Sequence, residues 1–217
     1  MTNARALALS LLEKAEKQTQ YSNIALDRAL SSSSLSGEDR ALCAALFYGV
    51  IEKRLTLDHR LAALSARPLD SLDLTARTAL RLGLYQLMFL DRIPPHAVLY
   101  ETVALCPKRS AGFVNAVLRA HTRTSPTPLP DEATDPVAYL SIRYSVGRAL
   151  VTKLLSIYDR ERTESLLSAF DRHPPTTLRV NTLRTSRDAL CRRIEGAEPT
   201  ALSPVGLFMR GARCRTE

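Results

Sequence analysis

Residues 74–90 read LTARTALRLGLYQLMFL. Apolar side chains recur three and four positions apart along this stretch, which is the spacing of one face of an α-helix. Asp73, directly before it, is a residue type that caps helix N-termini. We therefore expect a long amphipathic helix from Leu74 to Leu90. Such a helix needs other helices against which to bury its apolar face.

The flanking segments are helical by the same criterion. Six further segments show the helical spacing of apolar residues, at 3–18, 22–31, 37–51, 55–64, 96–105 and 111–120. Ser36 and Ser110 stand where N-caps are expected for the third and the last of these helices. Helices joined by short connections predict a compact bundle, so the fold class is mainly α.

The stretch LCAALFYGVI at residues 42–51 is the most apolar part of this bundle. It carries apolar residues on nearly every helical face, so we expect this helix at the centre of the bundle. Gly49 lies within it, where a glycine would let a neighbouring helix approach closely.

A proline-rich stretch, TSPTPLPDEATDP at residues 124–136, ends the bundle. Its four prolines exclude a continuous helix and favour an extended linker. We therefore predict a helical domain over 1–124, a linker over 125–136 and a second unit over 137–217.

The second unit changes character along its length. Residues 137–171 predict three short helices, whereas TTLRVNT at 176–182 alternates apolar and polar residues like a half-buried strand. A short helix capped by Ser186 and a strand or hairpin at 204–209 follow. This pattern predicts a small α+β segment that is incomplete at its C-terminal end.

The composition indicates the class of partner. The net charge is +8 and the pI is about 9.6, so the surface attracts polyanions, of which nucleic acid is the commonest in a cytoplasm. A generically basic protein is the alternative. No apolar run is long enough for a membrane span and Met1 to Lys14 lack the order of a signal peptide, so we expect a cytoplasmic protein without membrane contact.

Signatures of catalysis are missing from the sequence. The eight glycines never form G-x-G, so no phosphate or dinucleotide loop is visible. The four cysteines show no C-x-x-C spacing, which argues against a zinc site. The acidic pairs at 38–39 and 131–132 fall at a helix start and in the linker, where capping and solvation explain them. We expect no catalytic, cofactor or metal site in this chain.

Arg77, Arg81 and Tyr85 are spaced by four and form a stripe beside the apolar face of the 74–90 helix. Two cations and an aromatic ring suit contact with phosphates and stacking on a base. The alternative is a solvated face with salt bridges to a neighbouring helix.

A second stripe, Asn115, Arg119 and Arg123, lies on the last helix of the bundle. Lys108 and Arg109 precede the expected start of that helix at Ser110, where free amide groups, the helix dipole and two cations together favour a phosphate. Asn115 could equally serve as a buried capping or interhelical residue.

Three segments of the bundle resemble the NusB-type helical RNA-binding fold. They are GEDRALCAALFYGVIEKRLTLD (37–58), ALRLGLYQLMFLDRIPPHAVLYETVAL (79–105) and GFVNAVLRA (112–120). They are most similar to the version at the N-terminus of Sun/Fmu-type small-subunit (16S) rRNA 5-methylcytosine methyltransferases. Two later segments, at 140–159 and 174–190, resemble the linker domain that follows in those enzymes.

The resemblance implies that the chain binds a ribosomal RNA hairpin. It also implies methyl transfer from S-adenosylmethionine in a later, doubly wound domain. We expect that domain to be absent, because the sequence has no Pro-Gly-Gly-type cofactor loop and no cysteine that follows a proline. The chain would then be truncated before its catalytic domain and inactive by itself. A separate catalytic subunit or a downstream reading frame could supply the activity.

The resemblance also implies RNA contacts at single positions. Phe113 and Asn115 match an F-V-N element of the NusB-type fold, and Arg5 matches its basic first helix. Phe113 is also spaced by four from Val117, so a place in the core is the alternative for its ring. An exposed surface position is the alternative for Arg5. The complete set of RNA-binding candidates is Arg5, Arg77, Arg81, Tyr85, Lys108, Arg109, Phe113, Asn115, Arg119 and Arg123.

Two other functions remain open at this point. A stand-alone NusB-type regulator of transcription antitermination would share the bundle but would not need the segment LRVNTLRTSRDAL at 178–190. A helical bundle that binds only proteins would differ in its response to salt, because binding to RNA phosphates weakens steeply as the salt concentration rises.

Overall fold

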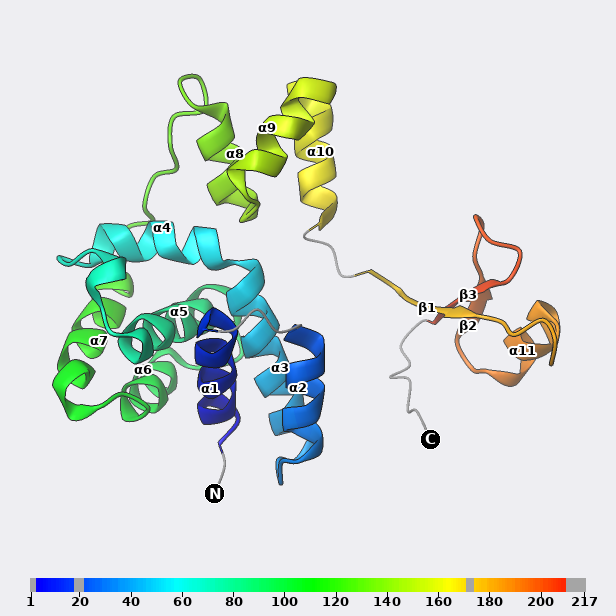
Figure 1. Cartoon of the computed structure of the whole chain (residues 1–217), viewed down its shortest axis with the longest axis horizontal. Helices are drawn as coiled ribbons and strands as arrows, with labels where there is room; N and C mark the ends of the chain where they lie inside the picture. Colours follow the sequence, from blue (N-terminus) through cyan, green and yellow to red (C-terminus); the bar gives the residue numbers. More distant parts are fainter. Residues whose placement is uncertain (1–2, 18–21, 171–173, 210–217) are drawn as a thin grey trace. The chain divides into compact units, whose positions relative to one another are not determined.

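The computed structural model describes residues 3–17, 22–170 and 174–209. The chain forms two compact units, Met1–Leu167 and Ser168–Glu217. The described residues contain eleven α-helices and three short strands, which confirms the mainly α-helical class with a small α+β segment (Figure 1). Among the described helices, none combines the length and the apolar character that a membrane span requires.

Seven α-helices and one 3-10 turn form the bundle of the first unit. They are α1 (Ala4–Lys17), α2 (Ser22–Ser31), α3 (Gly37–Glu52), α4 (Arg54–Leu64), η1 (Leu69–Ser71), α5 (Leu74–Phe89), α6 (Pro95–Ala104) and α7 (Lys108–His121). Two predicted caps are confirmed: the Asp73 carboxylate accepts a hydrogen bond from the backbone N–H of Ala76, and the Ser36 hydroxyl accepts one from that of Asp39.

Helix α5 is the central element of the bundle. Nine of its residues are buried, from Ala76 to Gln86, and α1, α3, α4, α6 and α7 all pack against it. The prediction for the stretch 42–51 holds only in part. Helix α3 packs against α1, α4 and α5 and buries Cys43, Leu46, Phe47 and Val50, but Tyr48 and Ile51 are 38% and 39% exposed. An apolar run therefore does not show that every face of a helix is covered.

Gly49 is the point of closest approach between α3 and α5. A Cβ atom on Gly49 would lie 2.0 Å from Cζ of Tyr85, which is far inside van der Waals contact. The tyrosine ring therefore occupies the space that a side chain at position 49 would need. This confirms the close approach that was expected from the glycine.

The start of α7 differs from the prediction. The helix begins at Lys108 with Pro107 at the N-cap position, so Ser110 lies in the first turn and is buried. The Ser110 hydroxyl donates to the carbonyl of Pro107 at 3.3 Å instead of capping the helix. Proline is favoured at helix starts because its φ is already helical and its missing N–H is not needed there. Lys108 and Arg109 are thus helical residues and do not precede the helix.

Three further helices complete the first unit: α8 (Pro136–Tyr144), α9 (Arg148–Ile157) and α10 (Arg160–Phe170). They enclose a small core of Leu140, Val151 and Leu167. Helix α8 is attached to α4, because the Thr56 hydroxyl donates to the carbonyl of Ile142 at 2.6 Å. The described contacts therefore continue beyond the predicted boundary at residue 124, whose role as a domain limit stays a prediction.

The proline-rich segment is bound to the bundle by one buried arginine. Arg60 on α4 is only 6% exposed, and its guanidinium donates to the carbonyls of Thr124 and Ser125 at 3.1 and 2.7 Å. The same guanidinium donates through Nε to Nδ1 of His121 at 3.1 Å. Because α7 ends at His121, Arg60 supplies donors to carbonyls just beyond the helix end.

The second unit contains β1 (Thr176–Arg179), α11 (Arg187–Arg193), β2 (Ala197–Pro199) and β3 (Gly206–Met209). The sheet is antiparallel with the order β1-β3-β2, and Met209 pairs with both Thr176 and Ala197. Ser186 caps α11 as predicted. Sequence reasoning missed β2, since a three-residue strand that ends in proline has no alternating pattern to detect.

We expect Gly49→Ala to destabilise the fold by about 1–3 kcal/mol, because the new methyl group must displace the Tyr85 ring. Gly37→Ala at the start of the same helix is the matched control, since no atom lies within 4 Å of a Cβ there. Urea denaturation measures both free energies of unfolding. Equal stability of the two variants would contradict the close approach at Gly49.

The Arg60–His121 contact predicts a pH effect. Burial, and next the charge of Arg60, lower the pKa of His121 from its ordinary value. The unfolded chain therefore takes up a proton before the folded chain does. The resulting stabilisation is complete above the unfolded pKa of about 6.5 and is lost as the pH falls through that value toward the lower folded pKa.

His121→Asn keeps a side-chain acceptor for Arg60 but cannot be protonated. We expect the melting temperature of the natural chain to fall more than that of the variant between about pH 7.5 and about pH 5.5. Thermal unfolding followed by circular dichroism measures both drops. The contact would have no role in pH dependence if the two drops were equal.

Candidate nucleic-acid interface

Helix α7 presents a basic face to solvent. Its sequence contains three cations, Lys108, Arg109 and Arg119, and no carboxylate, while Val114, Val117 and Leu118 on its other side are buried in the bundle. All three cations are exposed. Positions 108 and 119 are eleven residues apart, or about 16 Å along the axis, which is enough to follow a phosphate backbone over several nucleotides.

Asn115 and Arg119 are held together on this face. Nε of Arg119 donates to the side-chain carbonyl of Asn115 at 3.1 Å, one helical turn away. Lys108 lies on the same side of the helix, seven residues before Asn115. The structure therefore brings together three of the predicted RNA contacts. Arg123 lies just beyond the helix end and is exposed.

A hollow of about 400 Å³ lies beside this face, between α6 and α7. Its lining includes His96 and Tyr100 from α6 and the bonded pair Asn115 and Arg119 from α7. Tyr100 is 76% exposed, which is unusual for an aromatic side chain. An open aromatic ring beside a guanidinium is an arrangement that can stack a nucleobase and hold its phosphate.

Sequence reasoning missed His96 and Tyr100. Tyr100 directly follows Val98 and Leu99, two apolar residues of the same expected helix, so the local sequence gives no sign that its ring is exposed. The spacing of four between His96 and Tyr100 was the available signal, because it places both rings on one face of α6.

Phe113 lies elsewhere on α7, and its environment is mixed. The ring is half-buried and packs against the core of the bundle, and the guanidinium carbon of Arg67 lies 5.9 Å from the ring centroid. The structure therefore supports the packing role for Phe113, while its contact with RNA stays a prediction.

The arginines of the stripe on α5 are bonded to carboxylates of other helices in the bundle. Arg81 is 8% exposed and donates to Asp58 at 2.7 and 2.9 Å and to Glu16 at 3.2 Å. Arg77 donates to the same Glu16 at 2.9 Å. These bonds are the interhelical salt bridges of the alternative interpretation. Burial lowers the pKa of Arg81, but the two carboxylates outweigh this effect and raise it above its ordinary value.

Tyr85 completes the α5 stripe and also faces the interior. Its half-buried ring fills the space at Gly49 and lies 5.3 Å from the ring of Phe89. Burial, and next the charge of Glu52, raise the pKa of the Tyr85 hydroxyl. The structure therefore supports a packing role for Tyr85, while its stacking on a base stays a prediction.

Arg5 is partly engaged as well. Its Nε donates to the side-chain carbonyl of Gln86 at 2.8 Å, so the guanidinium joins α1 to α5. The side chain is half-buried. The start of α1 also reaches α6, because the side-chain amide of Asn3 donates to the carboxylate of Glu101 at 3.1 Å. The RNA contact predicted for Arg5 stays a prediction.

Neither Cys43 nor Cys106 is placed for thiol chemistry, and the described residues form no cluster of metal-ligating side chains. Burial raises the pKa of Cys43 to about 11, and burial and Asp73 raise that of Cys106 to about 11, so both thiols stay protonated near neutral pH. Among residues 3–17, 22–170 and 174–209, no group of three or more His, Cys, Asp or Glu could hold a metal ion.

Two family models match this chain. The NusB family model matches residues 2–123, and the model described as RsmF/B-like methyltransferase, ferredoxin-like domain, matches residues 148–213. The second match spans α9 to β3, which includes the antiparallel sheet.

Curated relatives match across most of the chain. It is 31% identical over 211 residues to the probable ribosomal RNA small subunit methyltransferase B of Synechocystis, with 95% of this chain and 47% of the relative covered. It is 33% identical over 203 residues to the corresponding Bacillus subtilis protein, with 91% and 45% covered. The chain thus spans about half the length of these relatives.

Solved structures share the fold. The crystal structure of antitermination factors NusB and NusE in complex with dsRNA matches with a TM-score of 0.51 and 22% identity, over 55% of this chain and 93% of that chain. The crystal structure of PH0851 matches with a TM-score of 0.66 and 17% identity, over 99% of this chain and 50% of that chain. Since the NusB model covers more than half of the residues, this chain belongs to the NusB family, in a form that joins a NusB domain to an RsmF/B-type ferredoxin-like domain.

Proposed function

We propose that this chain is the RNA-recognition part of a small-subunit rRNA cytosine 5-methyltransferase. The observation that supports this most directly is the α6–α7 surface, where an exposed tyrosine lies beside a helix face with three cations and no carboxylate. Methyl transfer from S-adenosylmethionine would belong to the half of the relatives that this chain does not span.

The surface can hold RNA by two kinds of contact. Lys108, Arg109 and Arg119 would bind phosphates, which supplies affinity without reading the sequence. Tyr100 would stack on an unpaired base, and the amide of Asn115 could form hydrogen bonds with the edge of that base. Unpaired bases of this kind occur in the loops and bulges of folded RNA, so a hairpin in ribosomal RNA fits the arrangement better than a regular duplex.

The other predicted contacts have a weaker basis. Arg77 and Arg81 are bonded to Glu16 and Asp58, so RNA would have to break interhelical ion pairs to reach them. Arg5 has one bond and a half-buried side chain, which leaves part of its guanidinium available. We place the binding surface on α6 and α7 and assign the arginines of α5 to the stability of the bundle.

A stand-alone regulator of transcription antitermination is the competing function. The bundle alone would serve it, and a solved NusB–NusE–RNA complex shares this fold. The match of residues 148–213 to the ferredoxin-like domain of RsmF/B-like methyltransferases favours the methyltransferase assignment. That domain lies outside the NusB match at 2–123.

Replacing Lys108, Arg109 and Arg119 with Ala should weaken RNA binding at least about tenfold. The slope of log affinity against log salt concentration should fall by up to about three units, one for each phosphate that is no longer bound. All three side chains are exposed, so the stability of the bundle should stay within about 0.5 kcal/mol. Fluorescence anisotropy with labelled fragments that tile small-subunit rRNA measures affinity and slope.

A second triple variant controls for net charge. Lys14, Arg28 and Lys153 are also exposed cations, and they lie on α1, α2 and α9. Their replacement with Ala removes the same charge from other surfaces. If both triple variants bound RNA equally weakly, binding would depend on the overall charge and the α6–α7 surface would not be the RNA site.

Tyr100→Ala should weaken binding to single-stranded rRNA fragments by about 1–3 kcal/mol, because one stacked base loses its platform. Tyr100→Phe keeps the ring and should bind like the natural chain. The same anisotropy measurement separates the two. A loss of affinity in the Phe variant equal to that in the Ala variant would exclude stacking as the role of this residue.

A further inference from the structure

Residues 124–129, which we call the strap, lie against α4 and are held by Arg60 of that helix. The guanidinium donates to the carbonyl and the hydroxyl oxygen of Thr124 at 3.1 and 2.9 Å. It also donates to the carbonyl of Ser125 and to the hydroxyl oxygen of Thr127, both at 2.7 Å. Four of the five N–H groups of Arg60 therefore bind the strap.

The fifth N–H group of Arg60 requires an uncharged histidine. Nε of Arg60 donates to Nδ1 of His121 at 3.1 Å, so Nδ1 carries no proton and the imidazole is neutral. A proton on Nδ1 would remove this acceptor and place a second positive charge against the guanidinium. Because two like charges at such a short distance repel each other, the closed strap and a protonated His121 disfavour each other.

No carboxylate is placed to relieve this repulsion. Arg60 is 6% exposed, and none of its partners among the described residues is acidic. A cavity of about 270 Å³ lies beside Arg60 and His121, and His59 is the other titratable residue of its described lining. The lining that comes from α5, α8 and the strap is uncharged, and α6 contributes none of it. Arg119 and Arg123, the charged residues nearest to His121 in sequence, are exposed cations.

His59 also contacts the strap, but its bond tolerates a proton. Its Nε2 lies 3.0 Å from the carbonyl of Pro128, and a carbonyl can only accept, so Nε2 carries a proton in the neutral ring. Protonation of the other ring nitrogen would leave this bond in place, because Nε2 remains a donor. Acid therefore removes the contact of His121 with Arg60 and keeps the contact of His59 with the strap.

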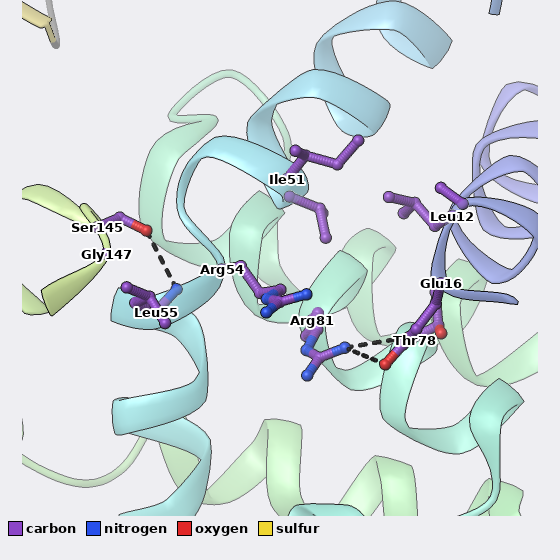
Figure 2. A pocket seen from close by; sticks show the side chains of 11 residues that line it. Leu12, Glu16, Ile51, Arg54, Leu55, Thr78, Arg81, Ser145 and Gly147 are labelled. Atoms are coloured by element: carbon purple, nitrogen blue, oxygen red, sulfur yellow. Dashed lines mark hydrogen bonds and ion pairs between the residues drawn. The ribbon is translucent and has the colours of Figure 1, made fainter. Parts of the chain in front are cut away.

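The attachment of α8 to α4 contains no histidine. The Thr56 hydroxyl donates to the carbonyl of Ile142 at 2.6 Å, and the Ser145 hydroxyl accepts a hydrogen bond from the backbone N–H of Leu55 at 3.1 Å (Figure 2). Hydroxyl and amide groups do not change their charge in the pH range in which a histidine titrates. Acid can therefore act on the strap without detaching α8.

We propose that the strap is part of a pH-sensitive switch, in which protonation of His121 on Nδ1 releases residues 124–129 from Arg60 while α8 stays attached to α4. Release gives the guanidinium water as its partner and opens the cavity beside it to solvent. The switch is local, since the core of the bundle keeps its packing. It does not depend on RNA binding at the α6–α7 surface.

The direction of the switch follows from linkage. Burial, and next the charge of Arg60, lower the pKa of His121, so the closed form resists the proton. A proton that binds the closed form more weakly favours the open form by the same factor. The strap is thus closed above the ordinary histidine pKa of about 6.5 and opens as the pH falls below that value.

An NMR titration of the natural chain from about pH 7.5 to about pH 5 tests the switch. The signals to follow are the ring C–H of His121, the Nε–H of Arg60 and the methyl group of Thr127. We expect all three to change with one common midpoint, while the methyl signals of the buried core residues Leu80 and Leu118 stay constant. The proposal would be overturned if His121 titrated without a change at Thr127, or if it took up its proton only when the core signals were lost.

Two histidine variants identify the group that is responsible. His121→Asn keeps an acceptor for Arg60 but cannot be protonated, so the strap signals should no longer change with pH. His59→Gln keeps an N–H donor for Pro128 and is the matched control, whose strap signals should titrate as in the natural chain. A titration that persisted in the His121 variant would show that this histidine does not operate the switch.

Thr127→Val separates a switch from a purely structural contact. It removes one bond between the strap and Arg60 at nearly constant volume, so the equilibrium constant for closing should fall about tenfold or more. Because closing and protonation are linked, the midpoint of the His121 titration should rise toward the ordinary value of a histidine. An unchanged midpoint would mean that the strap and His121 are not coupled.

Discussion

The position of Arg81 inside the bundle constrains the arrangement of the first unit. A buried guanidinium is costly unless carboxylates neutralise it, and here they come from α1 and α4. Glu16 and Asp58 therefore fix both helices against α5, and Arg77 adds a second bond to Glu16. Removing one partner of such a pair typically costs about 3–5 kcal/mol, and somewhat less where the carboxylates are partly exposed.

This constraint determines which surfaces are left for function. Ion pairs join α5 to α1 and α4. Exposed cations and an exposed tyrosine occur together on α6 and α7, which pack against another part of α5. Arg60 plays a comparable role at the end of α7, where it binds the proline-rich segment to the bundle. Two buried arginines thus hold the framework, whereas Arg109 and Arg119 on α7 are exposed.

Much of this fold could be predicted from the sequence, because local signals define helix ends. Asp73 and Ser36 cap as expected, and Gly49 marks a close helix contact. The roles of the arginines could not be predicted in the same way. A spacing of four places Arg77 and Arg81 on one stripe, but their partners lie up to 65 residues away, and only the tertiary fold shows whether a cation meets a carboxylate or water.

The same limit applied to Tyr100, whose exposure depends on what the neighbouring helices leave uncovered. The resemblance to NusB-type proteins pointed to Asn115 and the α7 segment, and the structure adds the tyrosine and the hollow beside them. The second unit also carries exposed arginines, among them Arg179, Arg192 and Arg193.

Ultraviolet cross-linking of the chain to labelled small-subunit rRNA, followed by mass spectrometry of the cross-linked peptides, tests the central claim most directly. The account predicts cross-links in residues 95–121, with Tyr100 among the modified positions. Cross-links confined to α5 or to residues 174–209, with none in α6 or α7, would contradict it.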